Sequence, residues 1–137
     1  MKIYNEAITL QSTKVREVFN ITWQVKAAVE KSSFRDGIIV VTSLHSNSAV
    51  IVNDEEPGLL ADLDAWLQQL APARHDYKHQ GRFESNSSVH FQSLLLHHQV
   101  IIPFTERRLD LGPWQFILFI ELDGQRPKRI SVKVVGE

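Results

Sequence analysis

The sequence predicts one α+β domain over residues 1–137, built on a β-sandwich of mostly antiparallel strands with about three short helices. A length of 137 residues is typical of a single domain, and a hydrophobic content of 43% is enough to form a buried core. The strand patterns outnumber the helical patterns and do not alternate with them one for one. This order favours separate sheets and helices over repeated βαβ units.

Seven segments have the β-branched and aromatic composition of strands. They are residues 3–10, 15–20, 38–42, 49–53, 100–105, 114–121 and 130–135. The segment 38–42 is apolar on both faces, so we expect a central strand that is covered on both sides. The segment 114–121 has the same pattern. One of its faces should meet the core, and the other needs a helix, a second sheet or a neighbouring subunit.

Three helices are expected between these strands. The first runs to about Lys31, with Thr22 as its N-cap. The second, Pro57–Leu70, repeats leucine and tryptophan every three or four residues and places proline at its first position. The third, Ser87–Leu96, follows the polar, turn-rich stretch 74–86.

The charge and the cysteine content exclude several classes of function. Fifteen lysines and arginines against sixteen acidic residues leave a net charge of −1, which offers no broad field to nucleic acid or to an anionic membrane. With no cysteine, the chain has no disulfide, no thiolate nucleophile and no cysteine-based zinc site. No signal peptide and no apolar run of roughly 20 residues is visible. We therefore expect a cytoplasmic protein.

Three of the six histidines have the best placement for chemistry. His45 ends a buried strand, His79 lies in the polar loop, and His90 lies in the short helix after it. If the loop and helix fold back onto the strand end, three neutral imidazoles can hold one divalent cation, with zinc the expected ion, and leave a position open for water. The alternative is that the loop only packs over the sheet and exposes His79.

Other polar residues have simpler interpretations. His97 and His98 are neighbours whose side chains point apart, and we assign them to a helix end. The run 126–129 is interpreted as a charged hairpin end. Glu121 and Gln115 share one strand face by parity. They either orient a histidine or lie in water at the ends of the strand.

Several local patterns together resemble the YjbQ-type family, also called the secondary thiamine-phosphate synthase family. They are His45-Ser46-Asn47-Ser48-Ala49, Asn53-Asp54-Glu55-Glu56-Pro57-Gly58-Leu59-Leu60, Tyr77-Lys78-His79, Asn86 with His90, Leu111-Gly112-Pro113-Trp114-Gln115, Glu121, Asp123-Gly124 and Gly136-Glu137. The sequence departs from the family pattern at Asn47, which replaces a hydroxyl residue, and at Pro113, which replaces a threonine.

The resemblance implies a homotrimer and a weak activity that joins a pyrimidine pyrophosphate to a thiazole phosphate. It places the metal ligands at His45, His79 and His90. Asp54 and Glu121 are then the candidates for a general base or for orienting groups. The expected substrate-binding residues are Ser46, Asn53, Asn86 and Gln115.

Other functions stay open at this stage. The chain could be a non-catalytic trimeric module that binds a metal or a metabolite, or a metal-dependent phosphate-ester hydrolase. It could also be a structural protein in which the histidines are incidental. A phosphorylated small molecule is the expected partner of either enzyme.

Overall fold

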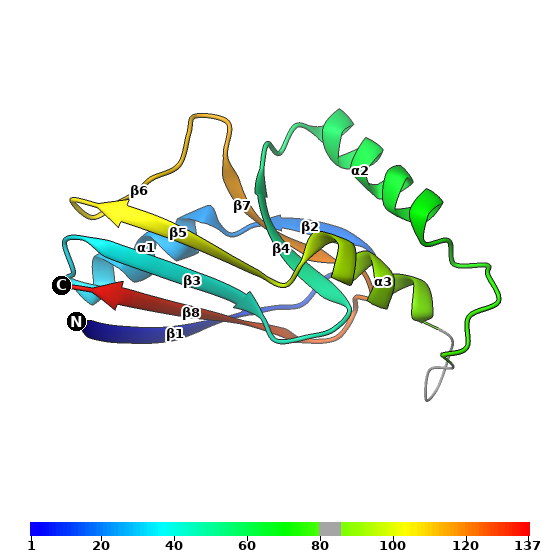
Figure 1. Ribbon diagram of the computed structural model, residues 1–137, viewed down its shortest axis with the longest axis horizontal. Coiled ribbons are helices and arrows are strands. Elements are labelled where there is room, and N and C mark those ends of the chain that lie inside the picture. The colour runs from blue at the N-terminus through cyan, green and yellow to red at the C-terminus, as the bar shows by residue number, and fades with distance from the viewer. Residues whose placement is uncertain (80–85) are drawn as a thin grey trace.

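The computed structural model describes residues 1–79 and 86–137. The elements in this part of the chain follow an irregular order of strands and helices (Figure 1). They are β1 (Lys2–Leu10), β2 (Glu17–Asn20), α1 (Thr22–Ser32), β3 (Gly37–Ser43), β4 (Ser48–Asn53), α2 (Pro57–Leu70), α3 (Ser87–Leu96), β5 (Gln99–Thr105), β6 (Arg108–Leu109), β7 (Phe116–Glu121) and β8 (Lys128–Gly136).

The strands form two sheets, as the predicted α+β sandwich requires. One sheet has the order β1-β8-β3-β5-β6 and the other has the order β2-β7-β4. Every strand pairing in them is antiparallel. The strands nearest in sequence are mostly not partners, because β1 pairs with β8 and β4 pairs with β7. The predicted fold class is confirmed.

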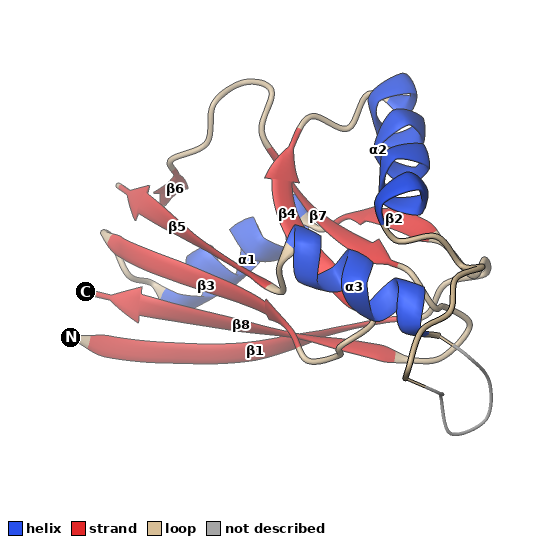
Figure 2. Cartoon of the chain, turned by 45° about the vertical axis from the view of Figure 1, so that its right-hand side comes forward, coloured by secondary structure: helices blue, strands red, loops and turns tan. Residues whose placement is uncertain are grey.

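The sheets and helices stack in layers (Figure 2), and two hydrophobic cores lie between them. The first lies between the five-stranded sheet, α1 and one face of the three-stranded sheet, and includes Ile39, Val41 and Phe119. The second lies on the other face of the three-stranded sheet, where Leu118 packs with Leu67 of α2 and with side chains of α3. The three-stranded sheet is therefore the middle layer.

The two doubly apolar strands have different surroundings. In β7, alternate residues enter the two cores, so its second face is covered by α2 and α3 of the same chain. In β3, Ile39 and Val41 are buried but Ile38 on the opposite face is 40% exposed. The prediction that this strand is central is confirmed, since β3 lies between β8 and β5. The prediction that it is covered on both sides is wrong.

Local hydrogen bonds explain where several elements begin. Helix α1 starts at Thr22, so the predicted N-cap is wrong: the Thr22 backbone N–H and hydroxyl both donate to Asn20 Oδ1, at 3.0 and 2.6 Å. Strand β7 begins at Phe116, two residues later than the predicted strand 114–121. The residues before it form a turn instead, in which Gly112 N–H donates to Gln115 Oε1. The Glu56 carboxylate caps α2 by accepting from Gly58 N and Leu59 N, each at 2.8 Å.

Helices of the described segments are all too short or too polar to cross a membrane.

Candidate functional site

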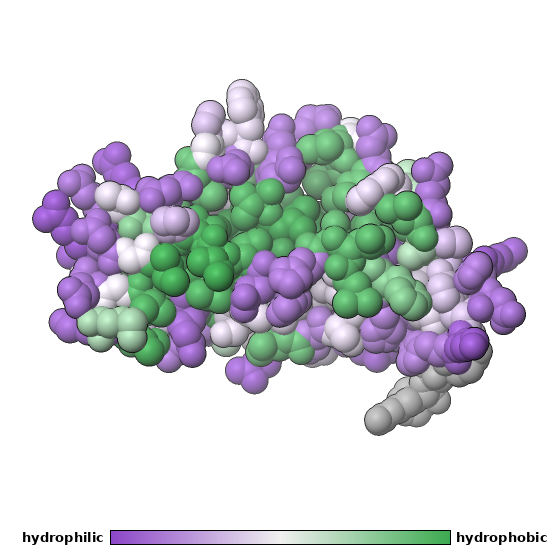
Figure 3. Space-filling model, in the orientation of Figure 1, coloured by the Kyte–Doolittle hydropathy of each residue, from purple (hydrophilic) through white to green (hydrophobic). Residues whose placement is uncertain are grey.

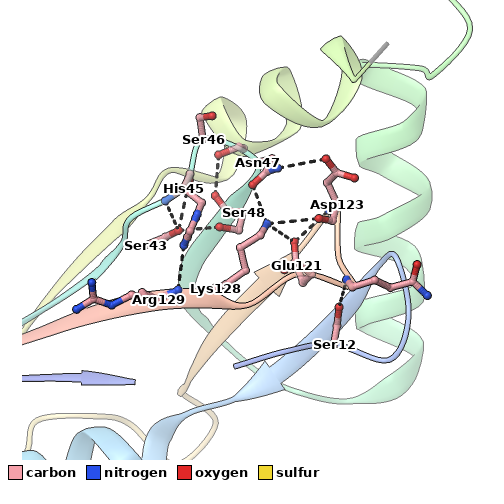
Figure 4. Close-up of polar contacts among 12 residues, drawn as sticks. Ser12, Ser43, His45, Ser46, Asn47, Ser48, Glu121, Asp123, Lys128 and Arg129 are labelled. Atoms are coloured by element: carbon pink, nitrogen blue, oxygen red, sulfur yellow. Dashed lines mark hydrogen bonds and ion pairs between the residues drawn. The ribbon is translucent and has the colours of Figure 1, made fainter. Parts of the chain in front are cut away.

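The candidate site is built on the tight connection between β3 and β4, residues 44–47. The hydroxyl oxygens of Ser43 and Ser48 lie 2.7 Å apart and close this loop from both sides. Ser48 is also held from α3, since the Ser93 hydroxyl donates to its carbonyl at 2.7 Å. The loop that carries His45, Ser46 and Asn47 is therefore held in place by β3, β4 and α3 (Figure 4).

His45 is bound to strand β8 through its ring. The Arg129 backbone N–H donates to His45 Nε2 at 2.9 Å, so the neutral ring carries its proton on Nδ1. Burial lowers the pKa of His45, and the nearby Lys128 and Arg129 charges lower it further, while Glu121 acts in the opposite direction. His45 is thus held as a neutral imidazole whose Nε2 lone pair is already used.

Two of the three histidines predicted to share a metal ion, His79 and His90, lie close together. Their ring centroids are 5.2 Å apart in an edge-to-face arrangement. His90 Nδ1 lies 3.1 Å from the carbonyl oxygen of Ser46, and His79 Nε2 lies 3.3 Å from Asn86 Oδ1. Because each ring donates one N–H to an oxygen, each keeps a lone pair on its other nitrogen.

A buried ion pair lies on the other side of the same loop. Lys128 and Glu121 are 3% and 1% exposed, and Lys128 Nζ lies 2.9 Å from Glu121 Oε1. Lys128 Nζ also donates to Asn47 Oδ1 at 2.8 Å, and Asn47 Nδ2 donates to Asp123 Oδ2 at 3.2 Å. Glu121 is therefore a partner of Lys128, and the departure at Asn47 joins the loop to the turn between β7 and β8.

The interpretation of residues 126–129 as a charged hairpin end is wrong for Lys128. Strand β8 begins at this residue, and its side chains alternate between buried and less buried positions. Lys128 therefore shares the core face with Ile130 and Val132. That parity was the signal in the sequence from which the buried lysine could have been found.

Three predicted site residues lie elsewhere. Asn53 is the last residue of β4, at the end far from the histidines, and pairs there with Phe116. Asp54 comes directly after it. Asp54 Oδ1 accepts from Glu55 N at 2.7 Å, and Gln115 Oε1 accepts from Gly112 N at 2.8 Å. The structure does not bring these side chains to the histidines. Gln115 also lies outside β7, so it does not share a strand face with Glu121.

A cavity of about 580 Å³ opens between the loop and α3. His45, Ser46 and His90 line it together with His97 and His98. The last two rings contact each other, with centroids 4.5 Å apart, so they do not point apart as expected. His97 ends α3 with φ 77° and ψ 163°, a region that is sparsely populated by residues other than glycine.

The histidines fit a metal ion only in part. Two imidazoles that share a tetrahedral Zn²⁺, with Zn–N bonds of about 2.0–2.1 Å, have ring centroids roughly 5 Å apart. The His79–His90 pair has this spacing, and the oxygen partner of each ring is typical of metal-binding histidines. His45 does not complete a set: within residues 1–79 and 86–137 no three His, Cys, Asp or Glu side chains are placed to hold one ion.

Comparison with known proteins gives the family. The profile of the YjbQ family, described as UPF0047 protein YjbQ-like, matches residues 6–137. The chain belongs to this family. Among its YjbQ-like relatives, a UPF0047 protein of Archaeoglobus fulgidus is 39% identical over 128 residues, which are 93% of this chain and 98% of the relative. A UPF0047 protein of Methanothermobacter thermautotrophicus is 36% identical over 137 residues, covering 100% of this chain and 95% of the relative.

Solved structures of YjbQ-like proteins share the fold over almost the whole chain. A YbjQ-like protein of unknown function from Sulfolobus solfataricus superposes with a TM-score of 0.94 at 31% identity, covering 99% of both chains. A hypothetical protein from Aeropyrum pernix has a TM-score of 0.91 at 28% identity, covering 98% of this chain and 99% of its own. The two-sheet architecture described above is thus the architecture of the family.

Proposed function

We propose that the chain is a cytoplasmic enzyme that binds a phosphorylated or pyrophosphorylated small molecule beside His79 and His90. The observation that carries the proposal is the pairing of these two imidazoles, each oriented by an oxygen partner, at the edge of a cavity lined by further histidines and hydroxyls. The reaction that the sequence resemblance implies, the joining of a pyrimidine pyrophosphate to a thiazole phosphate, needs such a place for phosphate oxygens.

His79 and His90 are the proposed ligands of a divalent cation, with zinc the expected ion. When bound, the cation supplies positive charge that polarises phosphate oxygens or activates water. The Ser46 carbonyl and Asn86 side chain hold the two rings in the tautomers that leave a lone pair free. His45 has a separate role, because its Nε2 is engaged by Arg129 N–H. Its remaining Nδ1–H is a donor for an oxygen of the bound molecule.

The metal content of the purified protein tests this assignment. We expect about one equivalent of zinc in the unchanged protein, loss of the metal in His79→Ala and in His90→Ala, and retention in His45→Ala. His75→Ala is the matched control, because His75 lies in the same loop but contacts Tyr77. A metal-free protein, or a metal that survives His90→Ala, contradicts the proposal. Loss of the metal in His45→Ala supports the three-histidine site in its place.

A panel of substrates separates catalysis from binding alone. The panel pairs a pyrimidine pyrophosphate with a thiazole phosphate and adds simple phosphomonoesters and phosphodiesters. We expect turnover of one member that is lost in His79→Ala and after removal of the metal. If the metal is present and no member reacts, the chain is a metal- or metabolite-binding module. If only the esters react, it is a phosphate-ester hydrolase.

We also propose that the chain forms a homotrimer through an exposed apolar face. Leu94 on α3 is 74% exposed and Ile101 on β5 is 59% exposed. Hydrophobic side chains gather on the face of the molecule where α2, α3 and β5 lie (Figure 3). Contiguous apolar surface of this kind typically marks an interface.

Sedimentation measures this assembly directly. We expect a trimer for the unchanged chain and a smaller species for a variant that combines Leu94→Glu and Ile101→Glu. Trp23→Glu is the control, because Trp23 is an exposed apolar residue of α1, which packs on the inner face of the five-stranded sheet. A monomeric unchanged chain contradicts the proposal.

A further inference from the structure

The carbonyl group of Ser46 determines which nitrogen of His90 carries the proton. His90 Nδ1 lies 3.1 Å from this oxygen, and a carbonyl oxygen can only accept a hydrogen bond. The neutral His90 ring therefore carries its proton on Nδ1 and keeps its lone pair on Nε2. With the carbonyl turned away, the ring would lose this constraint and both tautomers would be populated. The direction of one backbone carbonyl thus decides whether Nε2 of His90 is free to bind.

The Ser46 carbonyl belongs to the peptide group that joins Ser46 to Asn47. This group is planar, so the direction of its carbonyl is set by the residues on both sides of it. On the first side the loop is bound to the start of β8: Leu44 N–H donates to Arg129 O at 3.3 Å, and Arg129 N–H donates to His45 Nε2 at 2.9 Å. Because Ser46 itself is exposed, packing constrains the plane little, and Asn47 supplies the constraint from the second side.

The Asn47 side chain is held by both of its polar atoms (Figure 4). Its Oδ1 accepts from Lys128 Nζ at 2.8 Å, and its Nδ2 donates to Asp123 Oδ2 at 3.2 Å. Lys128 is the first residue of β8, and Asp123 lies in the turn before it. An amide group that is bound through both its oxygen and its nitrogen has a single orientation. The position of Asn47, and with it the peptide plane, is therefore set by the start of β8.

Lys128 is suited to this task by its burial and by its hydrogen bonds. Its ammonium donates to Asn47 Oδ1, to Glu121 Oε1 at 2.9 Å and to the Asp123 carbonyl at 3.4 Å. An ammonium group has three N–H donors, so none is left for a ligand. Lys128 is buried and is not among the described residues that line the histidine cavity. Its role is therefore to hold Asn47 rather than to touch a bound molecule.

We propose that Lys128, acting through Asn47 and the Ser46 carbonyl, is a positioning residue that fixes the tautomer of His90. A hydrogen bond from an ammonium group is stronger than one between neutral groups, and burial strengthens it further. The effect on the His90 ring needs no metal ion. Its consequence for zinc affinity rests on the proposed function, in which His90 is a ligand whose oxygen partner orients it.

Nuclear magnetic resonance of nitrogen-15-labelled, chelator-treated protein at about pH 8 reads the tautomer. Imidazoles are neutral at this pH, and correlations of the ring protons with both ring nitrogens separate the two forms. His90→Gln identifies the signals of His90. We expect a single form in the unchanged protein, with the proton on Nδ1. In Asn47→Ala we expect a mixture of both forms and, in a zinc titration, an affinity weakened roughly tenfold.

Two double variants separate this role from a loss of stability. Asn47→Asp with Asp123→Asn exchanges the amide and the carboxylate, and so keeps an oxygen for Lys128 and a hydrogen bond between positions 47 and 123. The single form and the zinc affinity should return in this variant. Lys128→Met with Glu121→Gln removes the ammonium without leaving a buried charge, and should give the same mixture as Asn47→Ala.

Asn20→Ala is the matched control, because Asn20 is also bound through both polar atoms but belongs to the connection between β2 and α1. Its Oδ1 accepts from Thr22 N at 3.0 Å and its Nδ2 donates to Glu55 Oε2 at 2.7 Å. The control should leave the His90 tautomer and the zinc affinity unchanged. A mixture in the unchanged protein, a single form in Asn47→Ala, or an equal change in Asn20→Ala overturns the proposal. A protein that binds no zinc but shows the expected change of tautomer supports this inference and contradicts the metal assignment.

Discussion

The two ends of the β4–β7 strand pair use the same kinds of polar residue in different ways. At the Ser48–Glu121 end, the polar side chains bond to residues that are distant in sequence, such as Lys128 with Asn47. At the Asn53–Phe116 end, five strand steps and roughly 17 Å away, the predicted site residues Asn53, Asp54 and Gln115 bond to neighbours in their own turns. Long-range polar bonds fix a site in three dimensions, whereas local ones shape a turn. The histidines lie at the first end.

The largest loss of stability is expected at the first end, when one member of the buried Lys128–Glu121 ion pair is removed. Lys128→Met leaves Glu121 charged, buried and without its partner, which should lower the free energy of unfolding by about 3–5 kcal/mol. Chemical denaturation measures the loss. The double variant with Glu121→Gln should recover much of it, since the uncompensated charge is then gone. Equal stability of the single and double variants would show that the charge is not the cause.

A smaller effect is expected from His45→Ala, and it should depend on pH. The variant leaves the Arg129 N–H without its acceptor, which should cost about 1 kcal/mol at pH 8. Because the folded state lowers the pKa of His45, the unfolded chain takes up this proton first as the pH falls. The stabilisation from neutral His45 is therefore complete above the unfolded value of 6.5 and is lost below it.

The stability difference between the unchanged protein and His45→Ala should thus narrow between pH 8 and pH 5. Urea unfolding of chelator-treated protein at several pH values gives this difference. His75→Ala controls for the loss of one imidazole from the chain. A gap that stays constant over this range would mean that the pKa of His45 is the same in both states.

The smallest effect is expected at the far end of the strand pair. Asp54→Asn keeps an oxygen for the Glu55 N–H and should change the free energy of unfolding by no more than about 0.5 kcal/mol. Zinc content should stay unchanged, because Asp54 lies away from the proposed metal ligands. A large loss of zinc would show that Asp54 reaches the site through a neighbouring subunit.

The sequence predicted those parts of the fold that depend on local periodicity. Helix α2 was found with its observed limits, because leucines at helical spacing and a proline at the first position act within one segment. Strand β6 was missed, because two residues carry no periodicity and are a strand only by pairing with Phe104 and Thr105. The pairing of β1 with β8 is likewise set by partners that are distant in sequence.

The candidate site, like the fold, was predicted only where its residues are close in sequence. The sequence suggested that His45, His79 and His90 could meet if the loop and the short helix fold back onto the strand end, and the structure places the rings of His79 and His90 in contact. Lys128 was assigned to the surface because its neighbours are charged, although its parity in β8 places it inside. Asp54 and Gln115 follow the family pattern in sequence, but β4 and β7 carry them to the opposite end.

The position of β1 has a consequence for how the chain folds. In the five-stranded sheet β1 is an edge strand whose neighbour is β8, so β1 can pair only after more than a hundred further residues have been synthesised. Until then the backbone groups of β1 are without their sheet partner, and closing so long a loop is slow. The domain therefore completes its sheet only once β8 has been synthesised, and until then β1 is exposed to aggregation or to chaperones.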